Sequence, residues 1–119
     1  MLMDVCWCST RTLFEEILTH EVAHAALITE ALKELGEDYV RPGTYSFPVK
    51  TVDQFVRFSG VLEQIGGSAY SGLLGLFSSS EFIEHGATVL AVEARQSAYV
   101  RHLTHFSPFP AVSNPHPDQ

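Results

Sequence analysis

Apolar residues recur at helical spacing in three stretches of the chain. In residues 10–35 they form one stripe, and the ionisable side chains of Glu21 and His24 fall on that same stripe. Gly36 follows at the position expected of a C-terminal cap. The pattern predicts a helix over residues 10–35 that turns two ionisable groups toward the protein interior. The apolar members of the stripe are Phe14, Ile17, Leu18, Ala25, Ile28 and Leu32.

The second stretch, residues 52–77, has the same apolar periodicity but is rich in glycine. A glycine in the interior of a helix costs about 1 kcal/mol relative to alanine, so the glycines need a reason. Gly60, Gly66 and Gly67 lie within four residues of Glu63. They predict either that a neighbouring helix or an ion approaches Glu63 closely, or simple close packing of helices. The pattern favours neither interpretation over the other.

A run of three serines, residues 78–80, separates the second stretch from a third helix predicted over residues 81–105. Its stripe again includes a carboxylate, Glu93, together with Gln96. The complete stripe is Val89, Leu90, Glu93, Gln96, Ser97, Val100 and Leu103.

The remaining segments do not show helical periodicity. Residues 1–9 are left unassigned, and residues 36–51 contain two glycines and two prolines, which is typical of a long connection. Residues 107–119 contain four prolines and are predicted to form an extended tail. The prediction is therefore an all-α fold with three long helices, whose single helical domain spans residues 10–106.

Composition and charge restrict the classes of partner. With 119 residues, the chain is long enough for one domain, and its 45% apolar and 18% charged residues are ordinary for a globular protein. The net charge of −7 argues against nucleic acid and against an anionic membrane surface as partners. No apolar run approaches the ~20 residues that span a bilayer, so no membrane span is predicted.

The N-terminal residues give little information about the compartment. They contain no basic region followed by a long apolar run, so no signal peptide is visible, and a cytoplasmic location is the default expectation. Cys6 and Cys8 have no partners elsewhere in the chain, which excludes an intramolecular disulfide framework and a cysteine-rich zinc module.

The pentapeptide His20-Glu21-Val22-Ala23-His24 permits two kinds of metal chemistry. In a zinc metallopeptidase, His20 and His24 bind zinc and Glu21 is the general base. In a four-helix carboxylate bundle, Glu21 and His24 form a Glu-x-x-His ligand pair and His20 lies on the polar side. A surface His20 and a core His24 without any metal is the third interpretation.

The positions of three glutamates favour the bundle interpretation. Glu21 lies 14 residues before the predicted end of its helix, and Glu63 lies 11 residues after the start of the next, which is roughly 21 and 16 Å along the helices. Glu63 lies 14 residues before the end of that helix, and Glu93 lies 12 residues after the start of the third, which is roughly 21 and 18 Å. In antiparallel helices the three carboxylates would reach a similar height. A shared metal ion or shared protons would then compensate their charge.

Several sequence segments resemble one known family. They are EEILTHEVAHAALITEAL, TYSFP, VLEQIGGSAYSG, VLAVEARQSAYVRHL and SPFP. In this order they resemble the ferritin-like domain of desiccation-related proteins and fungal stress- or sexual-development-type proteins over most of residues 14–112. The resemblance implies an up-down ferritin-like bundle in which four helices supply Glu, Glu-x-x-His, Glu and Glu-x-x-His to a pair of iron or manganese ions. It also implies an association with stress, and relatives of this kind are often secreted.

Carried over by motif, Glu21 and His24 correspond to the second family helix, Glu63 to the third, and Glu93 with Gln96 to the fourth. The chain departs from the family in two ways: no helix that carries the first glutamate precedes residue 10, and Gln96 stands where the family has histidine. An amide is a poorer ligand for iron than imidazole. The resemblance therefore implies an incomplete bundle with a degenerate site for iron or manganese, and a site without metal is equally open. Tyr70 and Tyr99 are candidate hydrogen-bond donors to the ligands, and aromatic packing explains them at least as well.

Three functions follow from this sequence. The first is a ferritin-like, stress-associated protein with a partial metal site and without robust catalysis, so a non-enzymatic role is favoured. The second is the small zinc peptidase, and the third is a non-catalytic helical module that binds a partner. Because a bundle without its first helix leaves apolar surface open, we also expect self-association through that groove.

Overall fold

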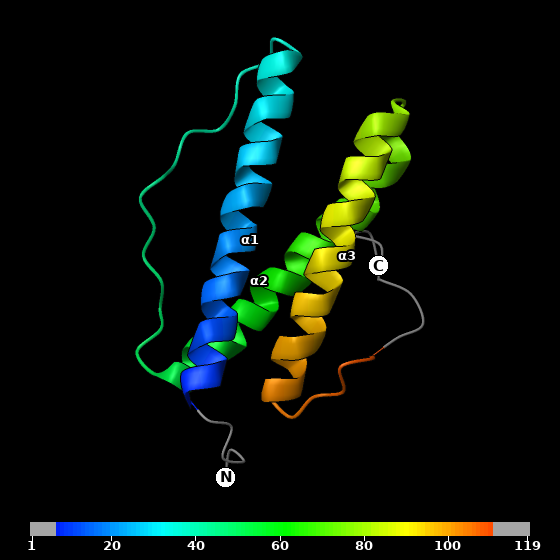
Figure 1. Cartoon of the computed structure of the whole chain (residues 1–119). Helices are drawn as coiled ribbons and strands as arrows, with labels where there is room; N and C mark the ends of the chain where they lie inside the picture. Colours follow the sequence, from blue (N-terminus) through cyan, green and yellow to red (C-terminus); the bar gives the residue numbers. More distant parts are fainter. Residues whose placement is uncertain (1–6, 111–119) are drawn as a thin grey trace. The chain divides into compact units, whose positions relative to one another are not determined.

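The computed structural model describes residues 7–110, and three long helices account for most of them. They are α1 (Trp7–Glu34), α2 (Val52–Leu73) and α3 (Ser80–Leu103), and the short 3₁₀ helix η1 (Leu74–Leu76) follows α2 directly (Figure 1). No strand occurs between residues 7 and 110. The all-α fold class predicted from the periodicity is confirmed. None of the helices in this range is long and apolar enough to span a membrane.

The helix boundaries differ from the predicted ones by a few residues. α1 begins at Trp7, in a segment without clear periodicity, and α2 ends at Leu73 instead of continuing as an α-helix to Phe77. The tighter η1 turn begins between Gly72 and Gly75, where the low helix propensity of glycine weakens the α-helix. The predictions for residues 1–6 and 111–119 lie outside the described residues.

The predicted cap of α1 is confirmed by its hydrogen bonds. Gly36 adopts a left-handed conformation with φ of 71°, and its amide donates to the carbonyl of Lys33 at 3.0 Å. The amide of Glu37 donates to the carbonyl of Leu32 at 2.9 Å. This pair of bonds is a Schellman motif, in which glycine reaches positive φ without a steric penalty.

α2 begins with a reciprocal cap. Thr51 is its N-cap residue, and the Thr51 side-chain oxygen accepts a hydrogen bond from the amide of Gln54 at 3.2 Å. The Gln54 side-chain oxygen accepts from the amide of Lys50 at 2.8 Å. Two backbone amides that the helix itself leaves without acceptors are satisfied in this way, which fixes the start of α2.

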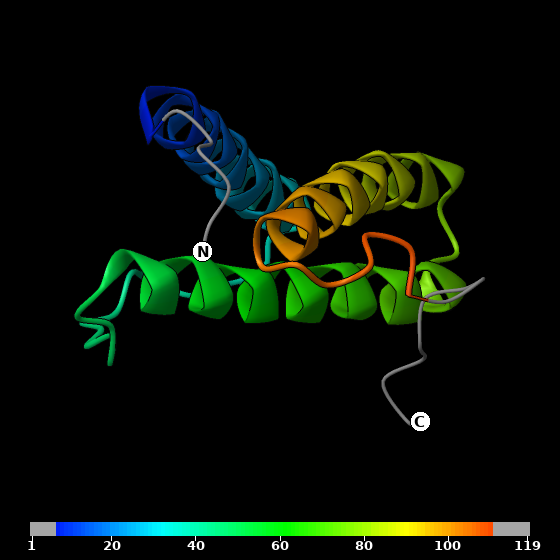
Figure 2. The ribbon, with the colours of Figure 1, turned by 90° about the horizontal axis from the view of Figure 1, so that it is seen from below.

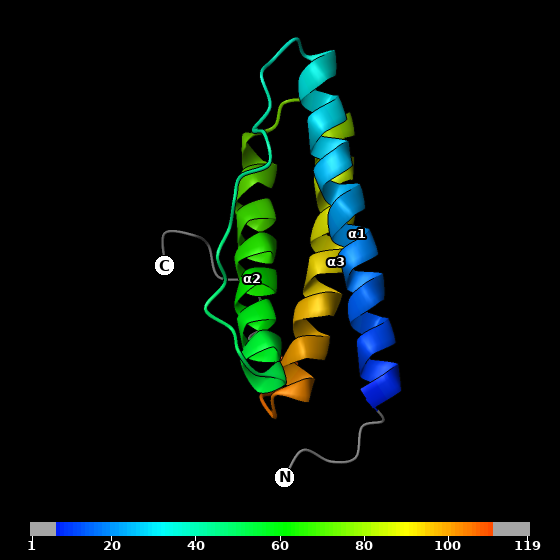
Figure 3. The same cartoon turned by 90° about the vertical axis from the view of Figure 1, so that its left-hand side faces the viewer.

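The chain divides into two compact units, of which the first ends at Tyr45 and the second begins at Ser46. The first unit contains α1. The second contains α2, η1 and α3, and here α2 and α3 run antiparallel and pack side by side (Figures 1 and 3). Val56, Val89 and Val100 are the buried apolar side chains of this unit.

The end of α3 is unusual because a histidine occupies the position that Gly36 occupies after α1. His105 has φ of 62°, its amide donates to the carbonyl of His102 at 3.1 Å, and the amide of Phe106 donates to the carbonyl of Arg101 at 3.0 Å. A left-handed conformation costs a residue with a Cβ atom more than it costs glycine. The turn is therefore stabilised by its hydrogen bonds against an unfavourable backbone conformation.

We expect the substitution His105→Gly to stabilise the protein by about 0.5–1 kcal/mol, because glycine removes the steric cost of the left-handed turn. The free energy of unfolding in urea measures the effect. The control His102→Gly lies in the last turn of α3 and should destabilise the protein by about 1 kcal/mol. A loss of stability in His105→Gly would show that the contacts of the histidine side chain stabilise the protein by more than its left-handed backbone conformation destabilises it.

Candidate metal centre

Two carboxylates and one amide on α2 and α3 are buried. Glu63 of α2 is 6% exposed, and Glu93 and Gln96 of α3 are 3% and 5% exposed. Val89 and Val100, which belong to the same predicted stripe of α3, are buried as well. The apolar periodicity thus placed Glu93 and Gln96 on the correct face of the helix. Buried carboxylates are rare in proteins unless a partner compensates their charge.

Gly66, one turn after Glu63, leaves the space that the Glu93 carboxylate occupies. A Cβ atom added to Gly66 would lie 2.5 Å from Glu93 Oε2 and 3.1 Å from Glu93 Cδ. At Gly67 the added atom would lie 3.8 Å from Glu93 Cβ, which is an ordinary contact. The chain therefore forms a side-chain-free recess in α2 that receives a carboxylate of α3 at the level of Glu63.

The other glycine of this group has a packing role. A Cβ atom added to Gly60 would lie 3.0 Å from Val100 Cγ1, so Gly60 allows α3 to approach α2 closely. The two glycines therefore have different contacts across the helix pair. Gly60 serves helix packing, whereas Gly66 accommodates the acidic side chain of the neighbouring helix.

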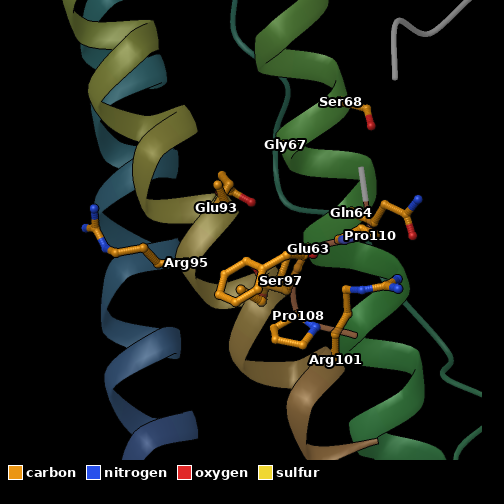
Figure 4. Close-up of a pocket in the computed structure, with 13 residues that line it drawn as sticks. Glu63, Gln64, Gly67, Ser68, Glu93, Arg95, Ser97, Arg101, Pro108 and Pro110 are labelled. Carbon is orange, nitrogen blue, oxygen red and sulfur yellow. The ribbon is translucent and has the colours of Figure 1, made fainter. Parts of the chain in front are cut away.

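A pocket of about 370 Å³ reaches the level of these acids (Figure 4). Small residues of both helices leave its volume open, and Pro108, Phe109 and Pro110 form one wall. The full lining is Glu63, Gln64, Gly67, Ser68, Glu93, Ala94, Arg95, Ser97, Ala98, Arg101, Pro108, Phe109 and Pro110. A volume of this size is sufficient for a small molecule or several waters.

Arg101 fixes the wall of the pocket. Its Nε donates to the carbonyl oxygen of Ser107 at 2.7 Å, and its guanidinium carbon lies 5.7 Å from the centre of the Phe106 ring. The segment after α3 consequently turns back beside α3 and α2 (Figure 2). The sequence indicated only an extended proline-rich segment, because periodicity carries no information about such a return.

α1 presents the Glu-x-x-His pair by itself. His24 Nδ1 lies 3.5 Å from Glu21 Oε1, as expected for residues three positions apart on a helix. His20 lies one turn before His24 on the same continuous helix. Within α1 the carboxylate and the imidazole are therefore close enough to act on one ion.

The two candidate hydrogen-bond donors, Tyr70 and Tyr99, belong to the same unit as the two buried acids. Tyr70 of α2 and Tyr99 of α3 are half-buried. Arg95 is exposed, and its side chain is directed away from Glu93 (Figure 4). Whether the tyrosines donate hydrogen bonds to metal ligands stays a prediction.

The comparison with protein families identifies the class of this arrangement. A family model described as a ferritin-like domain matches residues 8–105, which is most of the chain. The chain belongs to the ferritin-like domain family. The search of curated proteins finds no match.

Each unit of the ferritin-like chain carries donors that suit a metal ion. The buried donors on α2 and α3 are carboxylate and amide oxygens, and α1, taken by itself, carries a carboxylate beside an imidazole. Oxygen-rich sets of this kind suit manganese and ferrous ions. The recess at Gly66 would be filled by a single Cβ atom. It is consistent with a metal site because it leaves room for a charged group inside the helix pair.

Proposed function

We propose that this ferritin-like protein binds a single divalent cation, manganese or iron, through Glu21, His24, Glu63 and Glu93, and that it serves in a stress or desiccation response without robust catalysis. The recess at Gly66 carries this proposal. It receives the buried Glu93 carboxylate, and Gly66 lies one turn along α2 from Glu63, whose side chain is buried as well. Carboxylate oxygens are ligands that manganese and ferrous ions accept, and a bound cation would offset their negative charge.

The donor set supports one cation in preference to two. Two-metal centres of carboxylate bundles use a glutamate from each of two helices and a Glu-x-x-His pair from each of the other two. Here α3 has Gln96 three residues after Glu93, so an amide replaces the second imidazole. Because an amide is a neutral and weak donor, we propose that Gln96 is only an auxiliary ligand of the ion.

The association with stress rests on the motifs that carry the family resemblance. One of them, the SPFP segment of residues 107–110, lies beside the acids, because Pro108, Phe109 and Pro110 line the same pocket as Glu63. A motif that packs against the candidate site supports a shared architecture with desiccation-related ferritin-like proteins. Sequestering a redox-active metal is a role that needs binding residues and no catalytic group.

Metal titration of the purified protein tests this function. We expect elemental analysis after Mn²⁺ loading to give one bound ion per chain, and Glu63→Gln to weaken binding by at least about tenfold, since one charged ligand is lost. His20→Ala should leave Mn²⁺ affinity unchanged, whereas His24→Ala should reduce it. These two variants are matched, because each removes one imidazole from the same helix.

The same variants distinguish the zinc peptidase. If His20 and His24 held zinc and Glu21 were the base, His20→Ala would release the metal and Glu63→Gln would have no effect. That result, or a protein that binds no divalent ion, would contradict the proposed site.

A further inference from the structure

α2 has an apolar seam on a side of the helix that does not face α3. Its members repeat at the alternating three- and four-residue spacing of a coiled coil. Phe55, Leu62 and Ile65 are 44%, 48% and 59% exposed. We call this face the outer seam, which consists of Phe55, Phe58, Leu62, Ile65, Ala69 and Gly72.

The spacing and the chemistry of the outer seam indicate that its partner is a helix. A heptad repeat presents knobs and holes that another helix fills. The seam contains no charged residue, and the charged residues of α2 are Asp53, Arg57 and Glu63. Asp53 and Arg57 form an ion pair with each other at 2.9 Å, and Glu63 is buried against α3. A seam without charges does not repel an identical seam.

The order of large and small residues along the outer seam makes it complementary to an antiparallel copy of itself. The outer seam begins with two phenylalanines and ends with alanine and glycine. When two copies pair antiparallel, Phe55 faces Gly72, Phe58 faces Ala69, and Leu62 faces Ile65 of the partner. Each large side chain then meets a small one and the middle layer is aliphatic. A parallel pair would instead stack phenylalanine on phenylalanine at one end and leave a gap at the other.

We infer that two copies of this chain associate through their outer seams as an antiparallel, two-fold symmetric helix pair. In this arrangement the dipoles of the two α2 helices oppose each other, which is favourable. The paired seams extend over roughly 25 Å from Phe55 to Gly72. Half-exposed large side chains present on the order of 100 Å² each. Four such side chains give roughly 400 Å² per partner, about half of the roughly 800 Å² that is typical of stable interfaces, so we expect a dimer of moderate affinity.

One member of the outer seam already has a contact in its own unit. Phe58 packs edge-to-face against Phe47, with their ring centres 5.9 Å apart. Phe47 is itself 56% exposed, so its ring flanks the outer seam beside Phe58 and would take part in the interface of the pair. The inference is independent of metal binding, because none of the proposed ligands belongs to the outer seam: Glu63 is buried elsewhere on α2, Glu93 lies on α3, and Glu21 and His24 lie on α1.

Sedimentation velocity of the full chain tests the inference. We expect a dimer at tens of micromolar protein and an increase of at least about 30-fold in the dissociation constant for Ile65→Glu, which buries a charge at the centre of the interface. The neighbouring substitution Gln64→Glu adds the same charge beside the pocket and should leave the dimer intact. Circular dichroism should show unchanged helicity in both variants. A monomeric wild-type chain, or equal effects of the two substitutions, would overturn the inference.

Disulfide cross-linking tests the orientation in a background with Cys6→Ser and Cys8→Ser. In an antiparallel pair, a mixture of Phe55→Cys and Gly72→Cys chains should form a mixed cross-linked dimer on oxidation. Phe55→Cys alone should remain uncross-linked, because the two sites lie at opposite ends of the pair. Self-cross-linking of Phe55→Cys without the mixed product would demonstrate a parallel pair and overturn the proposed arrangement. The absence of any cross-link would contradict pairing through the outer seam.

Discussion

Glu93→Gln is expected to reduce Mn²⁺ affinity by about 100-fold or more while the metal-free protein remains folded. Glutamine has nearly the same shape as glutamate, so the packing between α2 and α3 and the recess at Gly66 are retained. The substitution removes one negative charge and replaces a strong carboxylate donor with a weak amide. Isothermal titration with Mn²⁺ measures the loss of affinity.

Thermal unfolding separates the effect of Glu93 on binding from its effect on stability. Mn²⁺ at about 100 times its dissociation constant should stabilise the wild-type protein by about 2.7 kcal/mol and raise its midpoint temperature. The midpoint of Glu93→Gln should not respond to Mn²⁺. Without metal, the free energy of unfolding of this variant should equal that of the wild type or exceed it by up to about 1 kcal/mol, because the variant no longer buries a charge.

Glu81→Gln provides the matched control on the same helix. Glu81 is an exposed acid in the first turn of α3, so its removal changes the net charge by the same amount without touching the site. Wild-type affinity in this control combined with lost affinity in Glu93→Gln would assign the effect to the buried site. Equal losses in the two variants would show that Mn²⁺ responds only to overall charge.

The sequence predicted the second unit well because its physical determinants are periodic. The apolar stripe of α3 contains Val89, Glu93, Gln96 and Val100, and all four side chains are buried. Gly36 identified the end of α1, because a left-handed cap strongly favours glycine. The constant rise of a helix predicted Glu93 near the height of Glu63, and Glu93 lies opposite Gly66, one turn along α2 from Glu63.

Other features depend on contacts that a periodic pattern does not encode. The role of Gly66 differs from that of Gly60 because different residues lie opposite each of them. The return of the segment after α3 is held by contacts of Arg101 with Ser107 and Phe106. His105 in a left-handed turn was not predicted either, since the expected residue at such a position is glycine or asparagine.

The start of α1 shows a third kind of discrepancy. Residues 7–9 have no clear apolar periodicity, yet the helix begins at Trp7. Extending an existing helix by one turn requires no new nucleation, so a segment of weak pattern continues it readily. Caps and periodicity therefore locate the body of a helix more reliably than its first turn.

Gly66→Ala is expected to weaken Mn²⁺ binding by at least about tenfold, although alanine is the better helix former. In an unconstrained helix this substitution would stabilise the protein by about 1 kcal/mol. Here the new methyl group would lie 2.5 Å from Glu93 Oε2, so the carboxylate must leave its recess. The carboxylate is the far end of a flexible side chain and can rotate toward the pocket, but it then no longer occupies the position in which it would bind the ion. Mn²⁺ titration together with urea unfolding measures both consequences.

Gly67→Ala is the control that makes this prediction specific. The adjacent glycine is also buried, but its added methyl group would lie 3.8 Å from Glu93 Cβ, at an ordinary contact distance. Gly67→Ala should therefore gain up to about 1 kcal/mol of stability and bind Mn²⁺ with wild-type affinity. If Gly66→Ala bound Mn²⁺ as tightly as Gly67→Ala does, the position of the Glu93 carboxylate in the recess would be irrelevant to the ion. Opposite behaviour of the two neighbouring glycines would instead show that the recess at Gly66 positions the carboxylate, since helix propensity affects both positions alike.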